Sequence, residues 1–351
     1  MRTRLDMPAY GRFIPPWPSR VALSPNFSPR LSSMSRGGYQ QINKALNACA
    51  FEDYLCTQLQ RLPQLEDIEQ ISPRVLRVLG QNAGKFTLQG TNTYIVGTGP
   101  SRLIIDTGQG IPEWADLISS TLTGASISLS QVLLTHWHGD HTGGVPDLLR
   151  LYPSLSTAIY KNSPSKDQQP IVDGQVFSVE GATLRAVHSP GHSHDHMCFI
   201  LEEENAMFTG DNILGHGTSA VEELGVYIST LQAMQSQNCT TGYPAHGAVI
   251  PNLPEKIAAE LAQKARRERQ VLQILANLQK EQGARKKGKS ASVTVQQLVG
   301  LMHGSGLDED VRTLALEPFI DEVLQKLAED GRVGFEMRSG EKRWFGVGDL
   351  A

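Results

Sequence analysis

The sequence predicts an α+β protein with a mainly helical C-terminal region. Between residues 75 and 237, a block of strand-like runs followed by a helical segment occurs twice in succession. This order is typical of packed sheets and helices rather than of an alternating βαβ repeat. No Gly-x-Gly-x-x-Gly run opens a predicted helix and no P-loop is present, so a nucleotide-binding α/β fold is not indicated. From residue 255 onward, three helical segments precede two short strands, which is the order of elements in winged-helix domains.

Hydrophobic periodicity and glycine or proline breaks define the elements of the first part of the chain. Helices are predicted over residues 39–62, 112–122 and 145–152, and strands over residues 75–79, 91–96, 103–105 and 132–134. The second block contains predicted strands over residues 157–160, 175–179, 183–187, 197–201 and 206–208, and it ends in a helix over residues 219–237.

The character of the sequence changes after residue 254. A long charged helix is predicted over residues 255–279, a Gly/Lys-rich linker over 282–290, helices over 294–302 and 317–329, and strands over 332–335 and 343–347. We therefore divide the chain into a leader (1–36), a main domain (37–254) and a winged-helix-like domain (255–351). The last domain has a net charge of only +1, which favours a docking role over DNA binding.

Composition and charge restrict the class of protein. The 351 residues are 40% hydrophobic and 19% charged, an ordinary globular composition. No apolar run approaches the roughly 20 residues of a membrane helix, so a soluble protein is expected. The four cysteines form no CxxC pair or dense framework, and we expect a reduced, cytoplasmic protein.

The charge is unevenly distributed. Residues 1–36 carry six arginines and one aspartate, which is typical of a disordered or transit-like leader; a gene-model extension ahead of Met34 is the alternative. Residues 37–254 carry 10 basic and 20 acidic residues. This acidic segment is an unfavourable general surface for nucleic acid, because that binding depends on neutralising phosphates.

The most distinctive stretch runs from Thr135 to Gly144. It places three histidines and one aspartate within six positions, namely His136, His138, Asp140 and His141. An apolar run precedes it and a helical pattern follows, so these side chains lie on a strand-to-helix loop. Neutral imidazole and carboxylate groups are ligands of zinc and similar metals. Four such groups exceed what one metal takes from one loop, which predicts two metals rather than a solvated histidine-rich loop.

Three later segments each place one further ligand on a loop after a predicted strand. His192 follows a Pro-Gly turn, Asp211 ends a strand, and His246 lies in a Pro/Gly frame that fixes its direction. Each predicted metal has three ligands of its own: His136, His138 and His192 for the first, and Asp140, His141 and His246 for the second. Asp211 is predicted to bridge them, as carboxylates do between cations roughly 3.5–4 Å apart. Each metal keeps an open position, which predicts a catalytic site; zinc is the expected ion and manganese the alternative.

This ligand pattern resembles the signature of the metallo-β-lactamase superfamily. The resemblance covers residues 72–250 and includes His136-x-His138-x-Asp140-His141 followed by the three later ligands. It implies a four-layer αββα sandwich with the metals at one edge of the sheets. With the C-terminal segment, the expected architecture is this sandwich followed by a winged-helix-like helical domain.

A narrower resemblance carries the expected substrate. Residues 38–47, 86–94 and 195–197, and the helical tail, are similar to the fungal atrochrysone carboxyl-ACP thioesterases, over residues 37 to about 348. That family belongs to the lactamase-beta-2-like branch and acts beside non-reducing polyketide synthases. The resemblance implies hydrolytic release of a polyketide, such as an atrochrysone carboxylic acid-like chain, from an acyl carrier protein in secondary metabolism.

The ligand chemistry also predicts roles for individual residues. A divalent metal lowers the pKa of a bound water towards neutrality and so supplies a nucleophile for the thioester carbonyl. We expect Asp140 to orient this nucleophile and to shuttle its proton. His196 is expected to support a ligand or to contact the oxyanion; a core histidine bonded to backbone is the alternative. Asp106, at the end of a strand, is expected to brace a ligand histidine.

Other functions were weighed against the thioesterase. A single-strand-specific endoribonuclease of the same branch would need a basic, aromatic-rich track to the site. A generic acyl-thioester hydrolase and a non-enzymatic winged-helix regulator are further alternatives, and the complete ligand set argues against the last. For the carrier protein, the basic runs at residues 264–269 and 285–289 are the expected docking surface. The sequence carries no signal for the oligomeric state.

Overall fold

The computed structural model describes residues 62–84, 86–283, 292–304, 306 and 309–348. The predicted leader (1–36) lies outside the described residues, as does the helix predicted over residues 39–62 except for its last position. Of the linker predicted over residues 282–290, only the first two residues are described, and they are helical.

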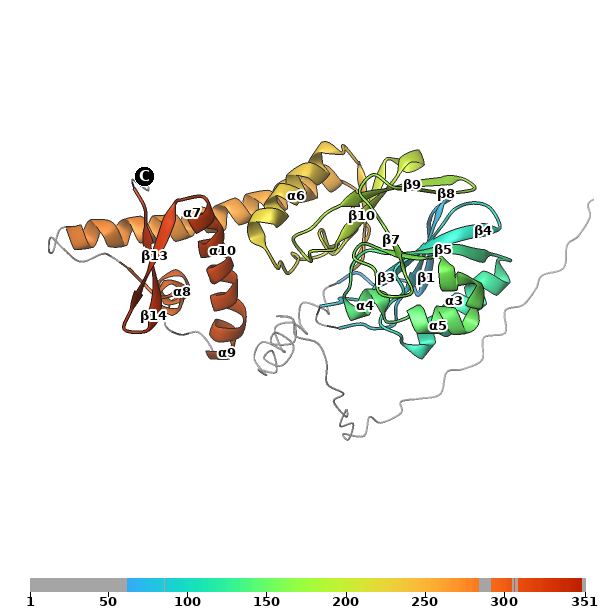
Figure 1. The fold of residues 1–351 in the computed structure, drawn as a ribbon, viewed down its shortest axis with the longest axis horizontal. Helices are drawn as coiled ribbons and strands as arrows, with labels where there is room; N and C mark the ends of the chain where they lie inside the picture. The colour runs from blue at the N-terminus through green and yellow to red at the C-terminus, as the bar shows by residue number, and fades with distance from the viewer. Residues whose placement is uncertain (1–61, 85, 284–291, 305, 307–308, 349–351) are drawn as a thin grey trace, which may run out of the picture. The chain divides into compact units, whose positions relative to one another are not determined.

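Seven strands form the first sheet, in the order β1-β2-β3-β4-β5-β6-β7 (Figure 1). Strands β1 to β4 pair antiparallel, whereas β4 to β7 pair parallel. The bounds are β1 (Ile68–Ser72), β2 (Val75–Leu79), β3 (Asn92–Val96), β4 (Ser101–Ile105), β5 (Ser128–Leu134), β6 (Ile159–Lys161) and β7 (Gln169–Pro170). Strands β1 and β7 are additions to the predicted set. The strand predicted from residue 157 begins two residues later, because the short helix η1 (Pro153–Thr157) precedes it.

The second sheet has five strands, in the order β12-β11-β10-β9-β8. All neighbours pair antiparallel except β11 and β12, which are parallel. The bounds are β8 (Val176–Val179), β9 (Ala182–His188), β10 (Met197–Leu201), β11 (Ala206–Gly210) and β12 (Thr241–Pro244), with the short helix η2 (Glu202–Glu204) between β10 and β11.

Alternate residues along the strands belong to different hydrophobic clusters, so both faces of each sheet are covered. On β10, Met197, Phe199 and Leu201 lie in the cluster between the two sheets. Cys198 and Ile200 lie instead in a cluster with α6 (Leu224–Ser236) and α7 (Leu253–Gly283). The outer face of the first sheet packs on α3 (Pro112–Gly124) and α5 (Val145–Leu151). The layers are therefore helix, sheet, sheet, helix (Figure 1), which confirms the predicted αββα sandwich.

The two sheets are also joined by polar contacts at the end of β12. On β3, Asn92 Nδ2 donates hydrogen bonds of 2.8 Å to the carbonyl oxygens of both Pro244 and Gly247. The Tyr94 hydroxyl donates to Pro244 O at 2.6 Å. These bonds surround His246, so the turn that carries this histidine is fixed to the opposite sheet.

The helix predicted over residues 219–237 is shorter than expected, because α6 begins at Leu224. The backbone amides of Glu222 and Glu223 donate to Gly191 O at 2.8 and 3.2 Å, so these residues hold a neighbouring loop instead of joining the helix. Gly191 has a φ of +127°, and a Cβ atom there would come within 2.5 Å of the Cα atom of Tyr227. Glycine is therefore required at this close approach.

The C-terminal region contains the predicted helices and hairpin. Helix α7 crosses the boundary predicted at residue 254, which stays a prediction. It is followed by α8 (Val295–His303), α9 (Glu309–Val311), the π-helical turn η3 (Arg312–Leu316), α10 (Glu317–Glu329), β13 (Val333–Arg338) and β14 (Glu341–Gly346). Ser339 and Gly340 both have positive φ values, as in a two-residue type I′ hairpin turn. Within the described residues, no helix is both long enough and apolar enough to cross a membrane.

Candidate metal centre

The predicted ligands come together from four loops of the two sheets. Strand β5 ends at Leu134, and the one-turn helix α4 (Gly139–Thr142) follows within the histidine motif. The remaining ligands lie between β9 and β10, after β11 and after β12. The ligand atoms form two groups, within each of which all atoms lie within 4.8 Å of one another: His136, His138, His192 and Asp211 in the first, and Asp140, His141, Asp211 and His246 in the second.

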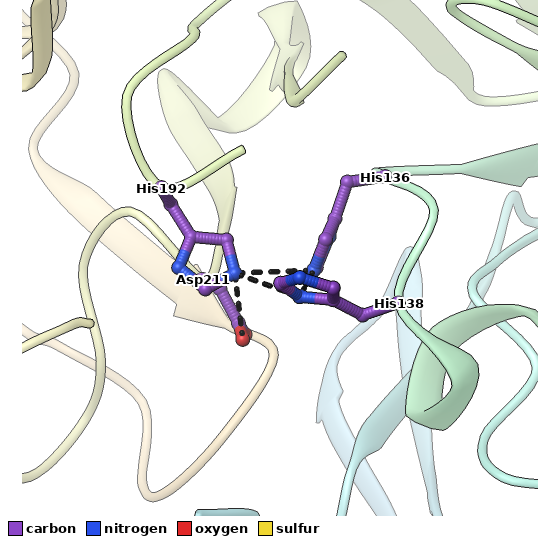
Figure 2. Close-up of side chains that lie close together, drawn as sticks. All are labelled: His136, His138, His192 and Asp211. Atoms are coloured by element: carbon purple, nitrogen blue, oxygen red, sulfur yellow. Dashed lines mark hydrogen bonds and ion pairs between the residues drawn. The ribbon is translucent and has the colours of Figure 1, made fainter. Parts of the chain in front are cut away.

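The first group, which we call the three-histidine group, is compact. His136 Nε2 lies 2.8 Å from His138 Nδ1. His192 Nε2 lies 3.2 Å from the former atom and 3.0 Å from the latter. Figure 2 shows His136 and His138 reaching this point from one side, and His192 and Asp211 reaching it from the other. All four residues are buried.

The second group, which we call the acidic group, combines carboxylates with two histidines. Asp140 Oδ2 lies 3.3 Å from His141 Nε2 and 3.2 Å from His246 Nε2. Asp211 Oδ1 lies 3.2 Å from His246 Nε2, and its Oδ2 lies 3.6 Å from His141 Nε2. Since the same Oδ2 atom is 3.5 Å from His192 Nε2, the Asp211 carboxylate lies between the two groups.

Asp106 holds the ring of His141 from behind. Asp106 Oδ2 accepts a hydrogen bond of 2.8 Å from His141 Nδ1. Its Oδ1 accepts from the backbone amide of Thr135 at 2.8 Å, and its Oδ2 from the Thr135 hydroxyl at 2.8 Å. Asp106 has a φ of +59°, a conformation that non-glycine residues adopt rarely and that these bonds hold in place. The bracing role predicted for Asp106 is therefore confirmed.

Backbone carbonyls hold two further rings, and sequence reasoning missed them. His192 Nδ1 lies 2.8 Å from Ala220 O and 3.1 Å from Ser219 Oγ. His246 Nδ1 lies 3.4 Å from Gly90 O. Because every residue has a carbonyl group, the type of residue gives no signal for these contacts. Only a prediction that begins α6 after residue 220, and one that places a loop at Gly90, would have left these carbonyl groups free to accept.

The donor atoms fit divalent metal ions. Tetrahedral zinc with bonds of about 2.0–2.1 Å to nitrogen holds two nitrogens roughly 3.3 Å apart, close to the 2.8–3.2 Å between the three imidazole nitrogens of the first group. In the acidic group, His141 Nε2 and Asp211 Oδ1 are buried, and their polar contacts in the described chain are other predicted ligand atoms at 3.2–3.6 Å. Buried polar atoms are rarely left in this state unless an ion or water satisfies them. The centre therefore has the donors and spacing of a divalent-metal site.

Burial keeps two members of the three-histidine group, His136 and His138, neutral. It lowers the pKa of His136 well below the usual value, and the neighbouring His141 and His192 act in the same direction. Burial likewise lowers the pKa of His138 to about 4. These imidazoles are thus unprotonated at neutral pH, which is the form that binds a metal.

In the acidic group, the histidine pKa values are raised rather than lowered. Burial would lower the pKa of His246, but Asp211 and Asp140 outweigh burial and raise this pKa to about 9. The pKa of His141 is also raised well above its usual value against the effect of burial, by Asp140, Asp211 and Asp106. Conversely, burial would raise the pKa of Asp140, but the charge and hydrogen bonds of His141 and His246 hold it below its usual range.

His196 lies behind the ligands and is fully buried. Its Nε2 accepts a hydrogen bond of 3.0 Å from the backbone amide of Asp211. A Cβ atom at Gly210 would come within 2.4 Å of the same nitrogen, so this contact needs glycine. This bond to a backbone amide is the contact expected of a core histidine bonded to backbone, which was the alternative predicted for His196. Support of the ligand Asp211 and contact with an oxyanion stay predictions. The exposed His188 and His194 contribute no atom to either ligand group.

The prediction that residues 264–269 form a basic docking surface is wrong for Lys264, which is buried. Lys264 is only 3% exposed, and its ammonium group contacts Thr218 rather than solvent. Arg267 is half-buried with its guanidinium over the Phe319 ring. Arg266 and Arg269 are exposed. In the sequence, the charged run is typical of a solvent-exposed helix face. In the structure, Thr218 and Phe319 contact this part of α7. Residues 285–289 lie outside the described residues.

Known proteins match the chain over most of its length. A protein of Emericella nidulans named Atrochrysone carboxyl ACP thioesterase is 73% identical over 315 residues, which cover 90% of this chain and 98% of that protein. A protein of the same name from Aspergillus terreus is 71% identical over 317 residues, covering 90% of this chain and 99% of that protein. The family model of the metallo-beta-lactamase superfamily matches residues 86–156 and 151–246, a range that contains both ligand groups. The chain belongs to the metallo-β-lactamase superfamily.

Solved structures of this superfamily share the fold. A beta-lactamase domain protein from Burkholderia ambifaria superposes with a TM-score of 0.63 and 19% sequence identity, covering 82% of this chain and 95% of that chain. A metallo-beta-lactamase family protein from Thermus thermophilus gives a TM-score of 0.55 at 18% identity, with 79% and 100% coverage. The sandwich occupies little more than half of the 351 residues, so these matches extend into the C-terminal region.

Proposed function

We propose that this protein is a two-metal thioesterase that releases a polyketide acid from an acyl carrier protein. The observation that carries the proposal is the pair of adjoining ligand groups that share Asp211. The substrate class, an atrochrysone carboxylic acid-like acyl chain, comes from the names of relatives that are 73% and 71% identical. In this proposal, the protein that carries the acyl chain is the acyl carrier domain of a non-reducing polyketide synthase.

The ligand assignment in this proposal follows the two groups. The three histidines would hold one ion, Asp140, His141 and His246 would hold the other, and Asp211, which belongs to both groups, would be available to each. When bound, the metals supply a water of lowered pKa and polarise the thioester carbonyl. Zinc is the proposed ion because imidazole nitrogens form most of the donor set, and manganese is the alternative.

Asp140 is the residue placed to move protons. Its side chain is 23% exposed, against 11% for Asp211 and 2% or less for His141 and His246, so among these ligands it is the most open to solvent. Asp140 is ionised at neutral pH, so it can accept a hydrogen bond from the attacking water and orient it. Because its depressed pKa makes it a weak base, it would pass the proton on rather than hold it. The leaving group is a thiol with a pKa of roughly 8.5, so it departs as a thiolate with little need for an acid.

His196 acts in this proposal as a positioning residue, because its ring touches the backbone amide of Asp211 and is sealed from solvent. An intracellular location is also proposed. Cys198 and Cys239 are free and buried, in keeping with a reducing compartment.

The test uses two candidate substrates. The purified full-length protein is incubated with a polyketide thioester of an acyl carrier protein and, separately, with labelled single-stranded RNA. We expect free carrier thiol and free acid, abolished by a chelator and restored by zinc. His192→Ala is expected to abolish release, whereas His188→Ala, an exposed histidine four residues earlier, serves as the matched control. Cleavage of RNA without release of thiol would contradict the proposal.

A further inference from the structure

Three charged residues on α7 form a column beside the loop that supports His192. Lys256, Glu260 and Lys264 are spaced by four residues, so they lie along one face of the helix. Glu260 is only 5% exposed and Lys264 only 3% exposed. Lysine and glutamate are almost never buried to this extent unless they are paired. Their partners therefore indicate what the column does.

The partners belong to the loop between β11 and α6. Lys264 Nζ donates to Thr218 Oγ1 at 2.9 Å, and the Thr218 hydroxyl donates to Glu260 Oε2 at 2.8 Å. Lys256 Nζ donates to Gly217 O at 2.8 Å and lies 3.1 Å from Glu260 Oε1. Hydrogen bonds with an ionised partner are the stronger kind, and buried ones are screened little by solvent. Residues 217 and 218 are thus fixed to α7.

The next two residues of the same loop hold a predicted metal ligand. Ala220 O lies 2.8 Å and Ser219 Oγ 3.1 Å from His192 Nδ1, and the Ser219 hydroxyl also donates to Ala220 O at 2.8 Å. Thr218 is directly adjacent to Ser219. The groups that hold the outer nitrogen of a metal-bound histidine set its orientation and strongly influence metal affinity.

Lys264 also connects this loop to two helices. Its ammonium nitrogen lies 5.6 Å from the centre of the Tyr227 ring in α6 and 5.8 Å from that of Phe319 in α10, both within cation–π range. The Tyr227 hydroxyl donates to Asn212 O at 2.7 Å, and Asn212 follows Asp211. One buried ammonium group therefore contacts the His192 loop, α6 and the C-terminal helical region.

We infer that Lys264, Glu260 and Thr218 form a positioning network that ties the metal affinity of the three-histidine group to the C-terminal helical region. The network fixes the loop of residues 217–220, and that loop fixes the ring of His192. The inference rests on the proposed function only in that the centre holds two metals; it needs no particular substrate.

The network is specific to one of the two ligand groups. In the acidic group, the ring of His141 is held by Asp106 and that of His246 by Gly90, and neither support belongs to residues 217–220 or to α7. Loosening the network is therefore expected to weaken one metal and to spare the other.

A substitution at Thr218 gives a direct test. Thr218→Val removes the hydroxyl while keeping the shape of the side chain, and Thr218→Ser keeps the hydroxyl. The full-length protein is loaded with two zinc ions, which are then withdrawn by titration with a chelator. In Thr218→Val we expect one of the two ions to bind about tenfold more weakly, with the other unchanged. Thr218→Ser and Arg266→Met, an exposed residue of the same helix, should match the wild type.

The outcomes separate this inference from the proposed function. Equal weakening of both ions, or unchanged affinity in a folded Thr218→Val variant, would overturn the positioning network. The thermal unfolding temperature at saturating zinc verifies that the variant is folded. Should it not fold, Glu260→Gln removes the carboxylate charge from the same hydroxyl and is judged by the same criterion. A wild-type chain that binds no zinc at all would instead contradict the proposed function.

Discussion

The three-histidine group and the acidic group share Asp211 and differ in most other respects. The first is buried, and burial lowers the pKa of His136 and that of His138, the latter to about 4. The second includes the partly exposed Asp140 and a histidine, His246, whose pKa is raised to about 9. Histidine pKa values thus shift in opposite directions within one site, because burial and neighbouring imidazoles lower them in one group, whereas carboxylates raise them in the other.

This difference assigns the two groups separate tasks. A cation that binds the neutral imidazoles of His136 and His138 displaces no proton from them. Such a site suits a metal that polarises the substrate carbonyl. The acidic group exchanges protons when a metal arrives and carries the carboxylate most open to solvent. It is therefore suited to handle the proton of the nucleophile.

The largest effect is expected from removing the residue that the two groups share. Asp211→Ala should lower the affinity of both metals and reduce thioester hydrolysis by more than about 10³-fold, equivalent to about 4 kcal/mol of transition-state stabilisation. Metal content and kcat/KM measure this. Asp167→Ala, an exposed aspartate, is the control. An Asp211→Ala variant that keeps two tightly bound ions would show that the groups do not depend on a common ligand.

Single substitutions should separate the groups. His192→Ala and His246→Ala are each expected to leave one bound ion of the two and to reduce hydrolysis by roughly 10²-fold or more, because losing a ligand should cost at least as much as losing a group that supports one. Metal analysis after desalting, combined with chelator titration, identifies which ion is lost. If both variants lost the same ion, the division into two groups would be incorrect.

A smaller and more selective change is expected at Asp106. Asp106→Asn keeps a hydrogen-bond acceptor for His141 and Thr135 but removes the negative charge beside the ring. We expect the acidic group to lose about 10- to 100-fold in metal affinity and the three-histidine group to keep its affinity. Glu113→Gln, an exposed acidic residue of α3, is the control. Unchanged affinity at both groups would remove Asp106 from the site.

The mildest intervention, a change of pH without any substitution, should also separate the two groups. In the metal-free protein His246 carries a proton up to a pKa of about 9, so its pairing with Asp140 and Asp211 stabilises the fold below pH 6.5 and is lost as the pH rises through 9. A metal must displace this proton and also that of His141, whose pKa is raised as well, so its affinity should rise by at least about tenfold per pH unit between 7 and 9. Affinity at the three-histidine group should stay constant over that range. Calorimetric titration in buffers of different ionisation enthalpy measures the protons released, and equal proton release at both sites would contradict the comparison.

Much of the centre could be predicted from the sequence, because metal ligands are chemically distinctive residues at restrictive spacings. Four predicted ligands lie within six positions, namely His136, His138, Asp140 and His141. Each later ligand lies in a Pro/Gly frame or at a strand end. The αββα sandwich was expected from the resemblance of the ligand pattern to the metallo-β-lactamase superfamily, whereas the order of strands and helices by itself indicated only an α+β protein.

The parts that could not be predicted depend on contacts between distant segments. Nothing in Glu222 or Glu223 signals that Gly191 O captures their amides and delays the start of α6. Lys264 lies in a charged helical run, and its burial depends on Thr218, 46 residues earlier in the chain. Strand β1 is short, mostly exposed and without alternation, so it lacks the pattern by which a strand is recognised.

The bonds from Asn92 and Tyr94 to Pro244 have a consequence for the order of assembly. They join residues 150 to 152 positions apart, and closing so long a loop is slow and entropically costly. During synthesis the histidine motif leaves the ribosome more than a hundred residues before His246, when the acidic group still lacks its last ligand. Both metal sites can therefore be complete only after the second sheet has packed on the first. A chain truncated before β12 would contain the histidine motif but would lack His246.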